Sequence, residues 1–211
     1  MSETEKPIHP RKIEIVHAAV TCFLEHGYHQ TGVRDIAKQA GISLGNLYNH
    51  FKGKDAVLAF IAELENEELA GYIELLTNPE DPGAALEQFI DEYAAYVARP
   101  DNALLGVEIL TEALRNPMIA EIFSKNRSRL IDALVSTLDN GSKTGVFISY
   151  DDQRAVACIV LDTLEGHGLR RFSKMTPSQN SIQAIRSFIL NGLKPYRRKP
   201  ENASHIKGGE P

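Results

Sequence analysis

Almost the whole chain repeats apolar residues at helical spacing, and this pattern limits it to an all-α fold. In the first segment the apolar positions lie three or four residues apart, on one helix face: Ile13, Val16, Val20, Phe23 and Leu24. Similar stripes recur between glycine- and proline-containing breaks as far as about residue 193. No alternating strand pattern and no internal repeat stands out. The sequence therefore predicts about nine helices and no sheet.

Glycine and proline divide this pattern into short N-terminal helices and longer C-terminal ones. We expect the first helix to stop at Gly27, the second to lie between a Thr31 cap and Gly41, and the third to run from a Ser43 cap to His50. The longer helices are expected over residues 54–76, 84–98, 102–115, 118–139, 152–173 and 178–193, with a loop at residues 140–145. We interpret residues 1–53 as a first domain, residues 54–194 as a second, and residues 195–211 as a flexible tail.

The second and third predicted helices are joined closely enough to form a helix-turn-helix pattern. Only Gly41, Ile42 and Ser43 separate them, and glycine can adopt the positive φ that such a turn requires. The third helix lies in the stretch SLGNLYNHF, which is rich in side chains that can bond to base edges or phosphates in a major groove. The pattern predicts a DNA-reading helix, although a surface hairpin with solvated polar residues has the same spacing.

Charge is spread unevenly along a chain whose net charge is -5. Arg34, Lys38 and Lys52 lie near the predicted reading helix, whereas no Lys or Arg occurs between Lys54 and Arg99. The first group can neutralise a few phosphates, and the acidic body would be repelled by them. With no apolar run of about 18 residues and no secretory leader pattern, we expect a cytoplasmic protein without membrane contact. Both cysteines, Cys22 and Cys158, fall in apolar helical patterns and are expected to be buried free thiols.

Residues 31–58, TGVRDIAKQAGISLGNLYNHFKGKDAVL, closely resemble the signature of the TetR family of bacterial transcriptional regulators. The resemblance implies a three-helix DNA-binding domain followed by a larger helical bundle. By position in the family motif, the residues expected to touch phosphates are Thr31, Arg34, Ser43, Tyr48, His50 and Lys54, and those expected to face bases are Leu44, Gly45, Asn46 and Asn49. Leu44 departs from the lysine, proline or polar residue that family members often have. Because amides pair well with adenine, we predict that Asn46 and Asn49 are the main sequence readers.

The same resemblance implies a homodimer in which the last two long helices of each chain form a four-helix bundle. The residues expected at this interface are Val156, Ile159, Leu164, His167, Ile182, Ile185 and Ile189. Their periodicity alone fits packing within one chain equally well. A two-fold dimer would present two reading helices to the half-sites of a palindromic operator.

A TetR-like body also implies a pocket for a small-molecule effector whose binding releases the operator, and a repressor as the family default. The residues expected to line it are Phe89, Tyr93, Tyr96, Glu108, Glu112 and Phe123, with Phe147 as a further aromatic candidate. Core packing is the alternative for the aromatic residues. An exposed or salt-bridged pair, with Arg127 or Arg170 as partner, is the alternative for the two glutamates.

A carboxylate metal enzyme in a helical bundle is the competing hypothesis. Glu14 and His17 have the Glu-x-x-His spacing of such sites, but it occurs once, whereas a two-metal site needs a second copy and further glutamates. The chain also has no G-x-S-x-G motif and no glycine-rich phosphate loop. We therefore expect no enzyme activity, no metal and no cofactor.

Overall fold

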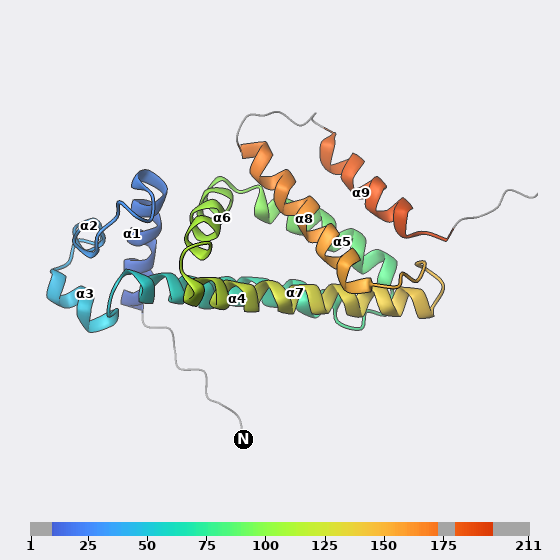
Figure 1. The fold of residues 1–211 in the computed structure, drawn as a ribbon, viewed down its shortest axis with the longest axis horizontal. Helices are drawn as coiled ribbons and strands as arrows, with labels where there is room; N and C mark the ends of the chain where they lie inside the picture. Colours follow the sequence, from blue (N-terminus) through green and yellow to red (C-terminus); the bar gives the residue numbers. More distant parts are fainter. Residues whose placement is uncertain (1–9, 173–179, 196–211) are drawn as a thin grey trace, which may run out of the picture.

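The computed structural model describes residues 10–172 and 180–195, which within those ranges form nine helices and no strand (Figure 1). This confirms the predicted all-α fold. The helices are α1 (Pro10–His26), α2 (Val33–Gln39), α3 (Leu44–His50), α4 (Lys54–Leu76), α5 (Pro82–Val97), α6 (Pro100–Ala113), α7 (Pro117–Lys143), α8 (Gln153–Phe172) and α9 (Ser181–Leu193). We refer to α1–α3 as the N-terminal domain and to α4–α9 as the body.

Several helices extend beyond their predicted ends. Helices α5, α6 and α7 each begin at a proline, at Pro82, Pro100 and Pro117, because the first helical position needs no N–H partner. Helix α7 continues to Lys143, so the predicted loop at residues 140–145 is wrong for most of its length. Gly141 lies within that helix, and its lack of a side chain lets the Phe147 ring pack against it, since a Cβ would lie 2.1 Å from a ring carbon.

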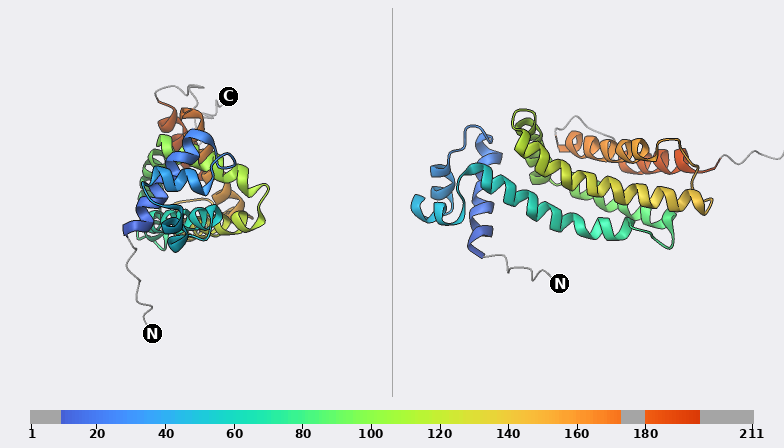
Figure 2. Two further views of the ribbon diagram at one scale, coloured as in Figure 1. Left: turned by 90° about the vertical axis from the view of Figure 1, so that its left-hand side faces the viewer. Right: turned by 60° about the horizontal axis from the view of Figure 1, so that its bottom comes forward.

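Two apolar cores lie along the molecule, and α4 contributes to both. The first core joins the N-terminal domain to the start of α4 and to α6 and α7, and is centred on fully buried Phe23, Ile36 and Leu47. The second core joins the far part of α4 to α5, α7, α8 and α9. Figure 2 shows α4 running from the N-terminal domain into the body. Helix α4 thereby belongs to both parts.

The predicted tail, the two cysteines and the absence of a membrane span are the remaining general predictions. Residues 196–211, which are most of the predicted tail, lie outside the described residues. Cys22 is buried and Cys158 partly buried, both as free thiols, and burial raises the pKa of the Cys22 thiol. Among the helices that the structure describes, none is long and apolar enough to cross a membrane.

Candidate nucleic-acid interface

Helix α3 is held in place by its turn and by one apolar side chain. Gly41 adopts a φ of +64°, and the Ser43 hydroxyl accepts a hydrogen bond from the backbone N–H of Asn46 at 3.1 Å. This bond satisfies one of the N–H groups that a helix N-terminus leaves free. Leu47 is fully buried and packs in the same core as Ile36. The rest of α3 is thereby turned outward.

The outward surface of α3 carries the polar residues that the sequence singled out. Gly45, Tyr48 and Asn49 are exposed, Tyr48 to 49%, and the partly buried members of the set are Leu44, Asn46 and His50. The cations predicted beside it, Arg34, Lys38 and Lys52, are all exposed. Figure 1 shows α2 and α3 at the end of the molecule furthest from α9. The structure therefore presents an outward helix face that is accessible to a groove and flanked by positive charge.

Thr31 has a different role from the predicted phosphate contact and helix cap. It is only 2% exposed, and its hydroxyl donates to the carbonyls of Cys22 at 3.1 Å and Gly27 at 2.9 Å. The N-cap of α2 is Gly32, whose amide donates to Asp35 Oδ2 at 2.8 Å. The Thr31 side chain closes the end of α1 because buried carbonyls there need a donor.

The ammonium group of Lys54 also points away from solvent. It donates to the Tyr28 carbonyl at 2.6 Å and lies 4.1 Å from the centre of the Tyr28 ring. The Tyr28 hydroxyl in turn donates to Asp55, and burial is the main reason that its pKa is raised. The Lys54 side chain therefore ties α4 to the α1–α2 loop.

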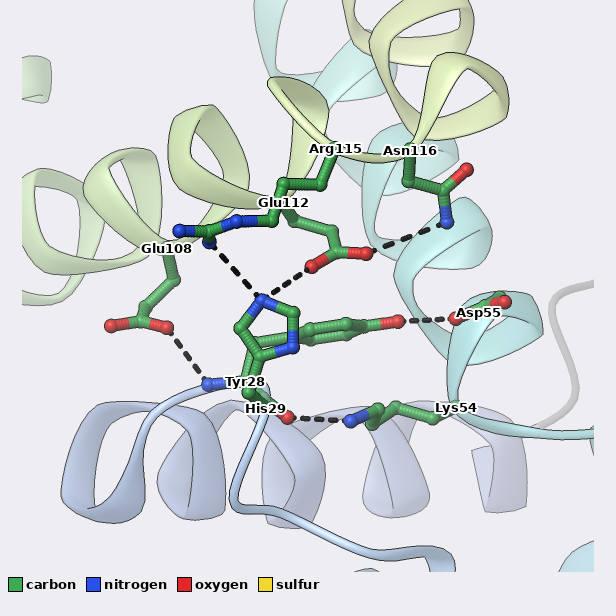
Figure 3. Close-up of polar contacts among 8 residues, drawn as sticks. All are labelled: Tyr28, His29, Lys54, Asp55, Glu108, Glu112, Arg115 and Asn116. Atoms are coloured by element: carbon green, nitrogen blue, oxygen red, sulfur yellow. Dashed lines mark hydrogen bonds and ion pairs between the residues drawn. The ribbon is translucent and has the colours of Figure 1, made fainter.

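Glu108 and Glu112, expected in an effector pocket, face the N-terminal domain instead (Figure 3). Glu108 Oε2 accepts the Tyr28 amide at 2.8 Å, and Glu112 Oε2 lies 3.1 Å from His29 Nε2. Arg115 Nη1 lies 3.3 Å from the same histidine nitrogen. We call these five residues the α6 junction. The structure places both glutamates against the α1–α2 loop, because α6 packs there, and a role for them in an effector pocket stays a prediction.

Tyr28 and His29 were missed by the sequence reasoning. They lie in a loop without helical periodicity, and their partners on α6 are 80 or more residues away in the chain. Short-range spacing contains no signal for such a contact.

Three of the predicted pocket aromatics do come together in the body. Phe89 and Tyr93 stack with ring centres 5.1 Å apart, Tyr93 and Tyr96 stack at 5.8 Å, and Tyr72 packs edge-on against all three. Phe123, by contrast, packs against the first core, beside the N-terminal domain, and Phe147 is buried in the second. The predicted pocket set is therefore divided among separate places.

Buried polar groups border this aromatic stack. Asn126 donates to Glu65 Oε2 at 2.8 Å, the Tyr93 hydroxyl donates to Glu165 Oε1 at 3.3 Å, and Arg127 Nη1 lies 3.5 Å from the same Glu165 oxygen. Burial raises the pKa of both glutamates, although the Asn126 hydrogen bond and the Arg127 charge oppose this. We call these five residues the body polar cluster. It brings two carboxylates and one guanidinium into an otherwise apolar interior.

The predicted dimer residues separate into buried and exposed groups within one chain. Leu164, His167 and Ile189 are buried, while Val156, Ile182 and Ile185 pack partly buried against the body core. Ile159 is 61% exposed, and Phe188, which the prediction omitted, is 77% exposed. The apolar stripe therefore marks mainly the inward face of α8 and α9, because packing within the chain uses the same periodicity. The uncovered apolar groups are on the outward face.

Glu14 and His17, the basis of the metal-enzyme hypothesis, are both exposed on α1, and Glu14 pairs with Arg11. Neither side chain points into a helical bundle.

Comparisons with known proteins agree with this geometry. Residues 15–60 match the family model described as bacterial regulatory proteins, tetR family. The chain is 31% identical over 157 residues to the HTH-type transcriptional repressor KstR2 of Rhodococcus jostii, a match covering 72% of this chain and 76% of that protein.

Solved structures extend the similarity to nearly the full length. Salmonella enterica GusR matches with a TM-score of 0.74 and 25% identity, over 91% of this chain and 99% of that chain. FadR of Bacillus subtilis, solved in complex with stearoyl-CoA, matches with a TM-score of 0.72 and 19% identity, over 86% of this chain and 98% of that chain. At that identity the second match shows a common fold.

Proposed function

We propose that this chain, which belongs to the tetR family of bacterial regulatory proteins and is a DNA-binding transcriptional regulator, represses its targets until a small molecule binds the body. It acts in the cytoplasm, on a palindromic operator, as a homodimer and without catalysis. The repressor role is supported by its relative KstR2, which is a transcriptional repressor.

The exposed face of α3 is the observation that carries this proposal. Leu47 is the one fully buried side chain of this seven-residue helix. The side-chain amides of Asn46 and Asn49 and the Tyr48 side chain are therefore available to a major groove. In this proposal Asn46 and Asn49 read bases, while Arg34, Lys38 and Lys52 contact phosphates. Two copies related by a two-fold axis would place their reading helices about 34–36 Å apart, or a multiple of that.

The body supplies the proposed effector site at the aromatic stack and the body polar cluster. Two glutamates against one arginine favour an effector with hydrogen-bond donors or positive charge, because a buried carboxylate is stabilised by such partners. The excess of carboxylates over cations in the body polar cluster disfavours a phosphate-bearing molecule such as the stearoyl-CoA bound to FadR. Effector binding would act by favouring a position of the N-terminal domains that does not fit the half-sites.

A fluorescence-anisotropy titration tests the DNA-binding proposal. The full-length protein is titrated with the duplex upstream of its own coding region and with a scrambled duplex, at about 50 mM and about 200 mM salt. We expect tighter binding to the upstream duplex, weakened by salt, and an altered base preference in Asn46→Ala and Asn49→Ala. Gln88→Ala, which removes an exposed amide from α5, is the matched control. Retention of the base preference by Asn46→Ala would refute the assignment of that residue.

A further inference from the structure

Lys12, near the start of α1, places its ammonium group over two aromatic rings from outside its own helix. Its Nζ atom lies 5.6 Å from the centre of the Phe51 ring and 5.0 Å from the centre of the Phe60 ring. The two rings meet edge to face, with centres 5.7 Å apart. An ammonium group within about 6 Å of a ring centre is attracted to the negative face of the ring. One side chain of α1 therefore contacts both rings at once.

The two rings belong to the end of α3 and to α4. Phe51 is the residue at which α3 ends: its backbone N–H donates to the Leu47 carbonyl at 2.9 Å, and its side chain is buried. Phe60 is also buried and lies on α4. Lys12 thus joins α1, α3 and α4 at one point. Because a seven-residue helix makes only about two turns, holding its last residue holds the direction of the whole of α3.

The Lys12 ammonium group is used within the protein. The side chain is partly buried, and among the described residues it forms no ion pair with a carboxylate, whereas its neighbour Arg11 pairs with Glu14. Lys38 and Lys52, which the proposed function assigns to phosphates, are instead exposed. The contacts of Lys12 therefore differ from those of the cations beside the reading helix.

We propose that Lys12 is a positioning residue for base reading: by holding Phe51 and Phe60, it keeps α3 in the direction that its side-chain amides need before DNA is bound. Without this contact a smaller fraction of the free protein has α3 in that direction. The apparent Kd for the operator then rises in inverse proportion to this fraction. The inference rests on the proposed function, because base reading by α3 is part of it.

The preference for the upstream duplex over the scrambled duplex is the first test. Full-length wild type, Lys12→Met and Lys12→Arg are titrated with both duplexes at about 50 mM and about 200 mM salt. Methionine keeps an unbranched apolar side chain and removes the charge. We expect Lys12→Met to lower the ratio of the two affinities about fivefold, the size of a cation–π contact, with the salt dependence unchanged. Lys12→Arg should restore the ratio, because a guanidinium also stacks on aromatic rings.

A direct phosphate contact by Lys12 would give a different result. Lys12→Met would then weaken binding to both duplexes alike and reduce the salt slope by about 1, and the inference would be overturned. An unchanged ratio of affinities in Lys12→Met would overturn it as well.

Lys125→Met is the matched control, because Lys125 is an exposed lysine on α7 that pairs with Glu121 at 3.0 Å, in the body of the protein. It should keep the wild-type ratio and salt slope. If it lowers the ratio as Lys12→Met does, the effect does not come from the aromatic contacts and the inference fails.

Hydrogen exchange tests the contact without DNA. The reporter is the peptide at residues 44–51, whose sequence is the same in wild type and Lys12→Met. We expect about fivefold faster exchange there in Lys12→Met, from the same loss of a cation–π contact, and unchanged exchange in the α5 peptide at residues 84–97. Equal exchange of residues 44–51 in the two proteins would contradict the inference. Lys12→Gln, which is also uncharged, replaces Lys12→Met if that variant exchanges faster in both peptides.

The two experiments separate this inference from the proposed function. If wild type shows no preference for the upstream duplex, the proposed function fails, and the exchange of residues 44–51 still decides whether Lys12 holds α3.

Discussion

The Lys54 ammonium lies 4.1 Å from the centre of the Tyr28 ring while it donates to the Tyr28 carbonyl at 2.6 Å. One cation thus holds both the ring and the backbone of the α1–α2 loop. The same loop meets α6 through Glu108 and Glu112. The N-terminal domain is therefore positioned from α4 and α6 together, and α4 is not its only connection to the body.

Replacing Lys54 should cost stability as well as DNA affinity. We expect Lys54→Met to lower the free energy of unfolding by about 2 kcal/mol, because it removes a charge-assisted hydrogen bond and a cation–π contact. Lys52→Met, two residues earlier and exposed, should change stability by less than about 0.5 kcal/mol while reducing the salt dependence of DNA binding. Urea unfolding of both variants measures the difference. Equal stabilities would show that the inward contacts of Lys54 contribute little.

Thr31→Val should destabilise the N-terminal domain because it buries a methyl group where a hydroxyl served two carbonyls. The expected loss is about 1–2 kcal/mol. Thr21→Val is the control. The Thr21 hydroxyl also donates to a carbonyl, that of His17 one turn earlier in α1, but at a more exposed site. Thermal unfolding compares them. If Thr31→Val unfolds as wild type does but loses affinity for DNA, the result would support the phosphate contact predicted from the sequence.

The stability of the body should fall as pH rises, through Glu65 and Glu165. Burial raises the pKa of both carboxyls in the folded protein, so the folded state retains protons that the unfolded chain has released. Their stabilising contribution is complete below the ordinary glutamate pKa and is lost as pH rises through the folded value. Glu65→Gln should therefore gain stability over wild type more strongly near pH 8 than near pH 5, measured by urea midpoints. Glu63→Gln, exposed on the same helix, should show no such trend; a parallel shift in both variants would argue against burial as the cause.

The proposed homodimer can be tested at the outward face of α9. Phe188→Glu should give a monomer in sedimentation velocity, because a charge replaces an aromatic ring that is 77% exposed in one chain. Leu114→Glu is the matched control: Leu114 is 82% exposed, at the end of α6 and away from α8 and α9. It should leave the oligomeric state unchanged. A wild-type protein that sediments as a monomer would refute the dimer itself.

Local spacing accounts for what could be predicted correctly. The apolar stripes around Ile36 and Leu47, and the glycine of the turn, depend on neighbours a few residues away, so the helix-turn-helix and the outward face of α3 were accessible without coordinates. The short stretch around Asn46 and Asn49 is polar because only one residue of α3, Leu47, is buried in the core, and this composition can be seen in the sequence.

Differences from the predictions arose where a side chain has a partner outside its own helix. Thr31 and Lys54 were expected to face phosphates but satisfy carbonyls of α1 and the α1–α2 loop. Leu164 and Ile189 lie in the body core of one chain, and their place at a partner chain stays a prediction, since inward and outward faces of a helix share one period.

The sequence by itself determined that the chain is helical, where most of its breaks lie and which short helix has an outward polar face, because these follow from contacts within one or two helical turns. Only the tertiary structure decided that Glu112 meets His29 and that Tyr28 is held between α4 and α6. A polar contact across 80 residues depends on how helices pack, and helix packing is fixed by the summed burial of many apolar side chains rather than by any local pattern.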